Sequence, residues 1–544
     1  MNNMLTMRIL SQKLFSTVLA VAFIGLAITF AGCDNLTDFK EINDNPNDPT
    51  NPPSTQQLAA ATTQFTYEVV ANEPVRTPTL WPQQLAANVQ GGGNIDVYQY
   101  REVDGNNLWE AFLYTGSIRN GRNIADAGLE EENFQNAGIG MVIEAYSWMI
   151  LTDLFGDVPF TEAFLPDENV SPSYDSQEIV YQYIIDRLGE ARENLGKTNL
   201  GTTDNSGADL LFAGDTDKWT SLAWALEARA HIHLTESGFE AGGVSGPDGH
   251  AQAALDAAQN AFPNGNADNP EFTFPGGENA ENPWFQYTIQ DVWIVSQQLS
   301  ANYIDLLKTN GDPRIVVQAR QTGAVDADGP VTGFEPAEFN AAEDFAPTDS
   351  TYRGHQNGAE QSQNIDEVSS IGSFYSDEDA SVFWFNYSEV KFIEAEAELI
   401  ASGSVNQNVE DAYREGIEAS MEQLGVVSRL SDLSPDSIAV DSIETFVDDF
   451  VQSRVDALNN ASDPLEVIIT EKYIANFINI EPYNDFRRTG FPDLQTVPGS
   501  VLDNIPARLA YPVSEYQTNG SNVPGNVPRG PQAGTVPVGW DPGV

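Results

Sequence analysis

Apolar residues recur at helical spacing through much of the chain, and long polar stretches separate the helices that they predict. In residues 134–154 an apolar side chain recurs every three or four positions, the period of a helix with one buried face. The same pattern predicts helices over residues 55–70, 176–195, 215–234, 250–261, 297–307, 387–401, 409–424, 443–458 and 465–478. The sequence therefore predicts a mainly α protein.

Two loop-rich stretches interrupt these helices. Residues 238–283 are rich in Gly, Asn, Asp and Pro outside one short helix, and residues 321–379 are acidic and loop-like. Helices that pair through short turns are the unit of tetratricopeptide (TPR) arrays, although the chain lacks the strict consensus of that repeat. We expect a TPR-like helix-pair scaffold with long loop-rich insertions and an irregular tail after Asn479.

The N-terminus has the parts of a secretory signal. A short basic head precedes an apolar run over residues 14–30, and Ala-Gly then leads directly into Cys33, which is the only Cys of the chain. This junction resembles the lipobox of bacterial lipoproteins, in which the Cys carries a lipid and becomes the mature N-terminus. The alternative is an uncleaved membrane anchor, since a span takes about 20 apolar residues. We expect a lipoprotein signal peptide over residues 1–32 and lipid attachment at Cys33.

The charge of the chain excludes one class of partner. The sequence holds 80 Asp and Glu residues against 25 Lys and Arg, a net charge of −55 over 544 residues. Nucleic-acid binding needs clustered basic groups, so we expect no nucleic-acid partner. Such a surface repels itself in dilute salt and much less when salt shortens the Debye length, so we hypothesise that the protein works in salty water.

Motifs for metal, cofactor or catalytic chemistry are weak or missing in the sequence. His231 and His233 lie two positions apart on a predicted helix, so they point to different faces and do not make a zinc pair. Glu394, Glu396 and Glu398 alternate on another helix and are interpreted as a solvated face. The sequence shows no nucleophile elbow and no phosphate-binding loop. We expect no metal, no cofactor and no catalytic residues.

Four stretches, in their order along the chain, resemble a known family. They read INDNPNDPT at residues 42–50, YSEVKFIEAEA at 387–397, YNDFRRTGFP at 483–492 and RLAYP at 508–512. This order resembles the SusD/RagB-like nutrient-binding lipoproteins of the Bacteroidetes outer membrane. Arg487 and Arg488 lie inside one of the stretches, and we expect them to bridge carboxylates or backbone carbonyls between helices instead of binding ligand.

The resemblance implies a location, a role and a partner. It implies a lipoprotein anchored in the outer membrane and facing outside, with an Asn/Pro-rich leash over residues 33–53 and a single α-helical binding domain over residues 34–544. It also implies capture of an oligosaccharide, which passes to a TonB-dependent SusC-like transporter. In the RagB-like branch of the family the ligand is a peptide.

Two other functions remain open at the level of sequence. A surface hydrolase of glycans would need two carboxylates held about 5–9.5 Å apart, and the sequence shows no motif for such a pair. A pure scaffold would use the helical array only to hold its barrel partner. Of these possibilities, a glycan-binding protein without catalytic activity is the function that we predict.

Aromatic residues in the loop-rich stretches are the candidates for ligand binding. Trp148, Trp219 and Trp224 fall on helix stripes and are expected in the core, whereas loops on a rigid scaffold are where binding groups tend to lie. The predicted ligand-binding residues are Trp81, Tyr98, Trp109, Trp284 and Trp293, with Tyr352 and His355 as further candidates. We expect a shallow site for a neutral glycan, in which each stacked ring contributes about 1 kcal/mol.

Overall fold

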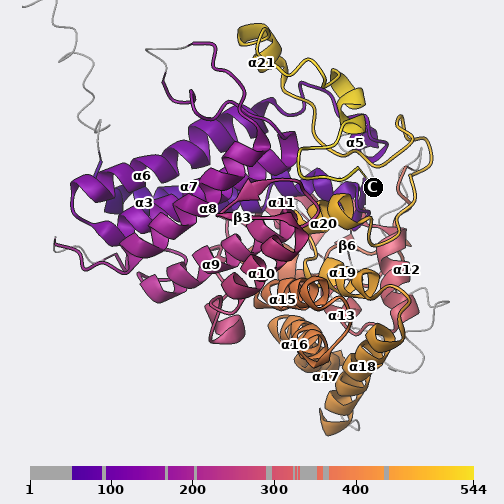
Figure 1. Ribbon diagram of the computed structural model, residues 1–544. Coiled ribbons are helices and arrows are strands. Elements are labelled where there is room, and N and C mark those ends of the chain that lie inside the picture. The colour runs from indigo at the N-terminus through magenta and orange to yellow at the C-terminus, as the bar shows by residue number, and fades with distance from the viewer. Residues whose placement is uncertain are drawn as a thin grey trace, which may run out of the picture. The chain divides into compact units, whose positions relative to one another are not determined.

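The computed structural model describes residues 52–87, 93–165, 170–200, 205–289, 297–322, 325–326, 329–330, 352–358, 367–433 and 440–543 (Figure 1). The chain divides into two units, Met1–Pro52 and Pro53–Val544. The signal peptide and Cys33 lie outside the described residues, so the following concerns the second unit.

Helices dominate the described residues and confirm the mainly α prediction. The first half holds α3 (Ser54–Gln64), η1 (Phe65–Val70), α4 (Glu73–Arg76), η2 (Pro78–Leu80), α5 (Gly93–Asp96), η3 (Asn107–Ile118), α6 (Arg119–Glu130), α7 (Phe134–Phe155), α8 (Gln177–Leu195), α9 (Thr216–His233) and α10 (Gly246–Ala258). The second half holds η4 (Gly265–Asp268), α11 (Pro283–Thr288), α12 (Ala301–Asn310), α13 (Ile315–Gln318), α14 (Ser373–Ser376), α15 (Tyr387–Ser402), α16 (Gln407–Gln423), α17 (Val426–Leu433), α18 (Val440–Asn460), α19 (Pro464–Ala475), α20 (Glu481–Thr489), α21 (Val513–Thr518) and η6 (Gly530–Thr535).

Strands occur only as short antiparallel pairs among the described residues. The pairs are β1 (Leu85–Ala87) with β5 (Gln297–Leu299), β2 (Glu240–Ala241) with β3 (Val244–Ser245), β4 (Glu271–Thr273) with β8 (Ser381–Phe383), and β6 (Val325–Asp326) with β7 (Gly329–Pro330). The first pair corrects one prediction: the helix expected over residues 297–307 begins at Ala301, because Gln297–Leu299 hydrogen-bonds to β1.

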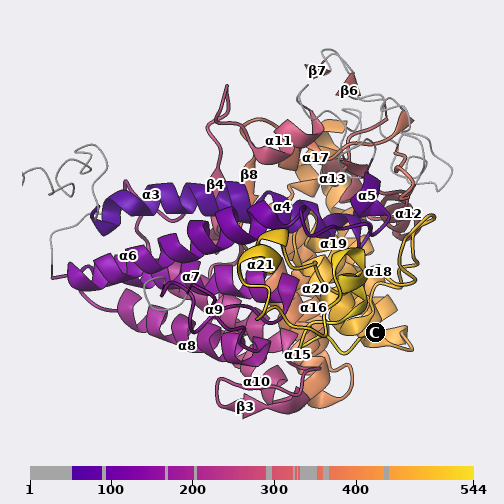
Figure 2. The same cartoon turned by 90° about the horizontal axis from the view of Figure 1, so that it is seen from above.

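Helix pairs form the scaffold, as predicted. α7 packs between α6 and α8, and α15 packs against α16 and α10. In Figures 1 and 2 the helices α3, α6, α7, α8 and α9 lie on one side, and the orange helices α15, α16, α17, α18 and α19 lie on the other. The tail after Asn479 is not irregular throughout, because it contains α20, whose polar residues pair inside the protein.

α7 is the central helix of the first group. The Asn133 side chain caps its first turn by accepting the Asn136 N–H at 3.4 Å, and Gly156 ends it with a positive φ of 74°. A Cβ on Gly140 would lie 2.5 Å from the Ala125 nitrogen of α6, so the two helices can approach this closely only through glycine. Among the described residues only α7 is long and apolar enough to cross a membrane, and its side chains are buried by neighbouring helices, as in a core helix.

Candidate functional site

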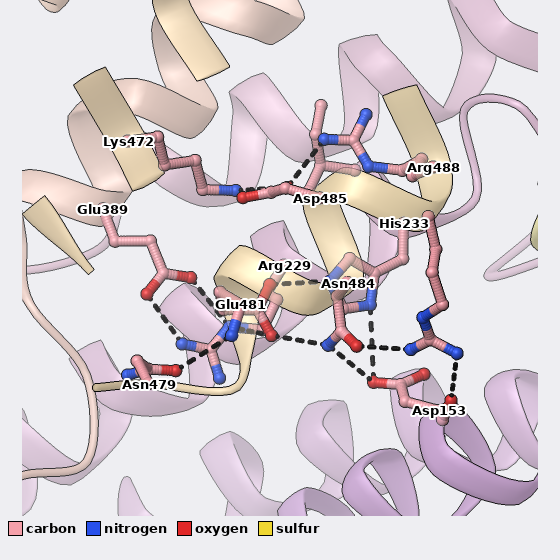
Figure 3. Close-up of polar contacts among 12 residues, drawn as sticks. Asp153, Arg229, His233, Glu389, Lys472, Asn479, Glu481, Asn484, Asp485 and Arg488 are labelled. Atoms are coloured by element: carbon pink, nitrogen blue, oxygen red, sulfur yellow. Dashed lines mark hydrogen bonds and ion pairs between the residues drawn. The ribbon is translucent and has the colours of Figure 1, made fainter. Parts of the chain in front are cut away.

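A cluster of charged and polar side chains lies inside the protein where five helices meet (Figure 3). We call it the Arg229 network, and each member is at most 2% exposed. Its members are Asp153 on α7, Arg229 and His233 on α9, Glu389 and Glu396 on α15, Lys472 on α19, and Glu481, Asn484, Asp485, Arg487 and Arg488 on α20.

Arg229 is paired on all sides. Its Nε and Nη2 donate to the two carboxylate oxygens of Glu389, both at 2.8 Å, and its Nη1 donates to the Tyr146 hydroxyl at 2.8 Å. The guanidinium also lies 4.1 Å from the centre of the Phe385 ring. This two-pronged pair fixes α9 against α15 and satisfies both charges without water.

His233 and Glu481 extend the network to α20. The His233 Nε2 lies 2.8 Å from a Glu481 oxygen, and its Nδ1 lies 2.9 Å from the Tyr181 hydroxyl, which donates to Asp153 at 2.5 Å. Burial by itself raises the pKa of Glu481, but Arg229 and His233 outweigh burial and hold that pKa below its usual range. The carboxylate therefore stays charged and paired.

The two arginines of the YNDFRRTGFP stretch bridge helices, which confirms the prediction for them. Arg488 donates to both oxygens of Glu396 and, at 2.9 Å, to Asp485, which also accepts from Lys472 at 3.0 Å. Arg487 Nη1 donates to the carbonyls of Asp153 and Ala507 at 2.7 and 2.9 Å. The solvated face predicted for Glu396 is wrong, because this carboxylate is fully buried against Arg488.

His231 has a different partner from His233, as their spacing predicted. Its Nδ1 lies 3.0 Å from Nδ1 of His250 on α10, and burial beside that second imidazole lowers the pKa of His231 to about 3. Among the described residues, no group of three or more His, Cys, Asp or Glu side chains is placed to hold a metal ion.

Most of the aromatic residues predicted to bind ligand lie in the interior. Trp81 and Tyr98 are completely buried, and Trp284 is 2% exposed. Trp81 donates from its indole nitrogen to the Ile95 carbonyl at 3.0 Å and packs edge-on against Tyr483. These three rings are part of the core, and Trp284 also borders a small pocket of about 40 Å³, which differs from the expected shallow site on loops.

The remaining predicted ligand-binding residues do not all lie in the same kind of place. Tyr352 and His355 are also interior, at 1% and 0% exposure. Trp293 lies outside the described residues. Trp109 is only 3% exposed, but it borders an open pocket. Of the predicted site residues, Trp109 is therefore the one that the structure brings to an open pocket of ligand size.

This Trp109 pocket has a volume of about 470 Å³, which is the size of small-molecule sites. It lies between η3, the segment after α7, and α21. The lining residues are Trp109, Glu110, Tyr114, Arg119, Pro159, Glu162, Ala163, Phe164, Leu165, Val170, Pro172, Ser514, Glu515 and Thr518.

The local backbone around the pocket is unusual. η3, which carries Trp109, Glu110 and Tyr114, is a π-helix of 12 residues, and π-helical segments are rare and frequent at functional sites. Phe164 adopts a positive φ of 64°, which side chains other than glycine seldom adopt. The π-helix and the positive φ of Phe164 are both backbone features that cluster at functional sites.

The floor of the Trp109 pocket is aromatic. The Trp109 ring lies 5.1 Å from Tyr114 and 4.9 Å from Phe155, and the Arg119 guanidinium lies 5.4 Å from the Phe164 ring. The Tyr114 hydroxyl donates to the Pro159 carbonyl at 2.6 Å, and burial raises its pKa well above the usual value. This tyrosine is a fixed wall and remains neutral.

Carboxylates stand at the edge of the pocket. Glu110 is exposed, whereas Glu515 accepts from the Tyr174 hydroxyl at 2.8 Å and Glu162 accepts from the Ser173 N–H at 2.7 Å. An apolar floor with hydrogen-bond acceptors around it suits binding of a ligand that has both apolar and hydroxyl surface. Sequence reasoning missed Tyr114, Phe164 and Glu515, since no pattern links residue 515 to residue 109.

Comparison with protein families decides the identity of the fold. A family model described as "SusD-like_2: Starch-binding associating with outer membrane" matches residues 46–512. The chain belongs to the SusD-like family. It is an outer-membrane nutrient-binding protein, and such binding proteins are non-catalytic. The predicted family and TPR-like fold are thereby confirmed.

Solved structures share this SusD-like fold across almost the whole chain. A SusD/RagB family protein from Bacteroides thetaiotaomicron has 22% identity and a TM-score of 0.71, covering 91% of this chain and 100% of its own. A protein described as chitin-binding has 23% identity and a TM-score of 0.69, covering 90% and 100%. A chitin-binding SusD homologue from Flavobacterium johnsoniae has 20% identity and a TM-score of 0.64, covering 90% and 97%. No relative among curated proteins matches the chain.

Proposed function

We propose that this SusD-like protein captures a neutral oligosaccharide in the Trp109 pocket and passes it to a TonB-dependent SusC-like transporter. The observation that carries the proposal is the open, aromatic-floored pocket of about 470 Å³ on a binding-protein fold. Sugar rings present apolar C–H faces that pack on aromatic side chains, and their hydroxyls donate to carboxylates such as Glu110.

The charge of the pocket favours a neutral ligand. Three carboxylates line it, from Glu110, Glu162 and Glu515, against the single guanidinium of Arg119. An anionic polymer would be repelled both by this lining and by the net charge of −55. Two of the similar structures are described as chitin-binding, so oligomers of N-acetylglucosamine are the first ligands to test.

The location proposed for the protein follows from its N-terminus. Residues 1–32 are cleaved as a signal peptide, Cys33 receives the lipid, and residues 33–53 form a leash to a single domain that faces outside. Acyl chains on Cys33 give stable attachment, because one chain alone anchors a protein only marginally. Detergent-phase partitioning of a Cys33→Ala variant tests this, and partitioning equal to that of the wild type contradicts it. The transporter should co-purify from gently solubilised membranes.

Calorimetric titration of the mature chain with chitotriose, maltotriose and a neutral tripeptide tests the ligand. We expect Glu110→Ala and Thr518→Ala to weaken saccharide binding about fivefold each, the loss of one hydrogen bond. Both residues are exposed, so neither change should disturb folding. Glu130→Ala, an exposed carboxylate on α6 outside the pocket, is the matched control.

The outcome separates the remaining alternatives. Saccharide binding that all three variants leave unchanged would place the site elsewhere. Binding of the tripeptide alone would favour the RagB-like role, and release of shorter sugars would contradict the non-catalytic role. Binding of neither ligand would leave a scaffold for the barrel.

A further inference from the structure

The C-terminal part of the chain encloses a second cavity, which shares no lining residue with the Trp109 pocket. This Asp541 cavity has a volume of about 430 Å³. Its walls come from α20, the segment 501–507, η6 and the last residues of the chain. Arg487 and Asp541 lie at its buried end, and Asp503, Asn504, Gln532 and Thr535 lie at its exposed rim.

Arg487 is fixed in place at the buried end of this cavity. Its Nη1 donates to the carbonyls of Asp153 and Ala507, and its Nη2 donates to Asn484 at 2.5 Å, while its Nε is sealed from solvent and has no hydrogen-bond partner among the described residues. The guanidinium cannot turn to find a partner, because it lies between the rings of Tyr483 and Trp540, 4.1 and 4.6 Å from their centres. Arg487 is therefore a charged wall held by the protein at the buried end of the cavity, and the contacts to a ligand come from the other lining residues.

Asp541 supplies a hydrogen-bond acceptor. It is 8% exposed, and one of its oxygens accepts the Gly543 N–H at 2.7 Å. Among the described residues it forms no ion pair. Burial raises the pKa of Asp541, and the nearby Arg487 partly offsets that rise. The carboxyl can therefore accept a hydrogen bond from a ligand hydroxyl or amide.

The walls of the cavity are fixed before any ligand arrives. The Ala507 N–H donates to the Gly534 carbonyl at 2.8 Å, and the Tyr483 hydroxyl donates to the Pro506 carbonyl at 2.7 Å. A Cβ on Gly534 would lie 2.9 Å from that of Pro506, so η6 packs directly on the segment 501–507. Binding would then require little ordering of the chain, which removes one of the costs of forming a complex.

The donors and acceptors of the cavity define the ligand class. The net charge of −55 disfavours an anionic ligand. Asp503 and Asp541 also repel anions, whereas the guanidinium disfavours a cation at the buried end. Amides and hydroxyls at the rim, from Asn504, Gln532 and Thr535, match a neutral ligand that donates and accepts.

We infer that the Asp541 cavity is a second binding site, which takes one neutral saccharide unit by hydrogen bonds to Asp541 and the rim amides of Asn504 and Gln532. The inference rests on the proposed function for the class of ligand, but on separate residues for the site. A polymer that occupies both sites on one chain, or on neighbouring chains, is held more tightly than either site alone would hold it.

Titration of the mature chain with chitotriose, in three variants, tests the second site. Asn504→Ala/Gln532→Ala removes two exposed rim amides, and Asp541→Asn changes the buried acceptor. Gln517→Ala/Asn526→Ala removes two exposed amides of the same region outside the cavity and is the control. We expect two binding events in the wild type, one of which weakens at least about fivefold in the first two variants and not in the control.

Each outcome decides between the two sites. If both events persist unchanged in the rim variant and in Asp541→Asn, the second site is wrong. If the wild type shows only the event that Glu110→Ala weakens, the Trp109 pocket stands and the second site is wrong. If it shows only the event that the rim variant weakens, the second site stands and the Trp109 pocket is wrong. Absence of any saccharide binding overturns both.

Discussion

The Arg229 network and the Trp109 pocket both combine charged and aromatic side chains, but they differ in what the charges face. In the network, Arg229 and Glu389 are fully buried and hydrogen-bonded to each other. At the pocket, Glu110 and Thr518 are exposed beside an open volume of about 470 Å³. Charges whose partners are inside the protein hold helices together, whereas polar groups beside open space are available to a ligand. Changes in the network should therefore lower stability, and changes at the pocket should lower affinity.

The largest expected effect comes from breaking the central pair of the network. Glu389→Ala leaves the Arg229 guanidinium buried without its two-pronged partner, and we expect a loss of about 3–5 kcal/mol in the free energy of unfolding. Asp104→Ala, which removes the partner of the half-exposed Arg101, should cost less than about 1 kcal/mol. Denaturant unfolding measures both, and equal losses would contradict a structural role for the network.

Changes to the core aromatic residues should lower stability, as changes in the network do, and should leave saccharide affinity unchanged. Trp284 is 2% exposed on α11, so Trp284→Ala should lower the free energy of unfolding by about 3 kcal/mol through the cavity that it leaves. Saccharide affinity of the fraction that remains folded should equal that of the wild type. Calorimetry at a temperature well below the unfolding midpoint checks this. A large loss of affinity in folded protein would indicate that Trp284 is part of the binding site.

Local patterns in the sequence predicted what local forces determine. The apolar spacing in residues 134–154 predicted α7, but it also predicted one buried face, whereas neighbouring helices bury α7 on every side from Asn136 to Phe155. The order of four short stretches predicted the family, and with it the bridging role of Arg487 and Arg488. Glu396 was misread as solvated because its burial depends on Arg488, which lies 92 positions further along the chain.

The Trp109 pocket could not be predicted either, because the residues that form it lie far apart in the sequence. Loop composition distinguished Trp109 from tryptophans on helix stripes, but it selected Trp81 and Trp284 equally, although tertiary packing buries them. The wall formed by Ser514, Glu515 and Thr518 comes from a six-residue helix with no buried residues of its own. Nothing in its sequence shows which distant element it faces.

Acid should weaken the network more than the rest of the protein. The pKa of Glu481 lies below its unfolded value, so its stabilisation is complete above that unfolded value, near pH 4.5, and is lost as the pH falls below it. The glutamine of Glu481→Gln cannot titrate. Between pH 5 and pH 3 the free energy of unfolding of this variant should therefore fall by on the order of 2 kcal/mol less than that of the wild type. Unfolding free energies across that range measure the difference, and parallel curves would contradict the assigned pKa shift.

Salt should have the smallest effect and should act on the surface alone. Screening of the net charge of −55 by 1 M NaCl should raise the unfolding midpoint. The free energy of unfolding should rise by about 1 kcal/mol. The loss in the free energy of unfolding caused by Glu389→Ala should persist in 1 M NaCl, because salt screens buried pairs poorly. A midpoint that stays flat or falls across a salt series would contradict the hypothesis that the acidity is an adaptation to salty water.

A crystal structure of the mature chain with chitotriose, at a concentration above its measured dissociation constant, tests the central claim most directly. The account predicts electron density for a sugar ring against Trp109 and Tyr114, within hydrogen-bonding distance of Glu110, and an Arg229–Glu389 pair unchanged at 2.8 Å. A Trp109 pocket that stays empty while the sugar is bound elsewhere on the protein would contradict it.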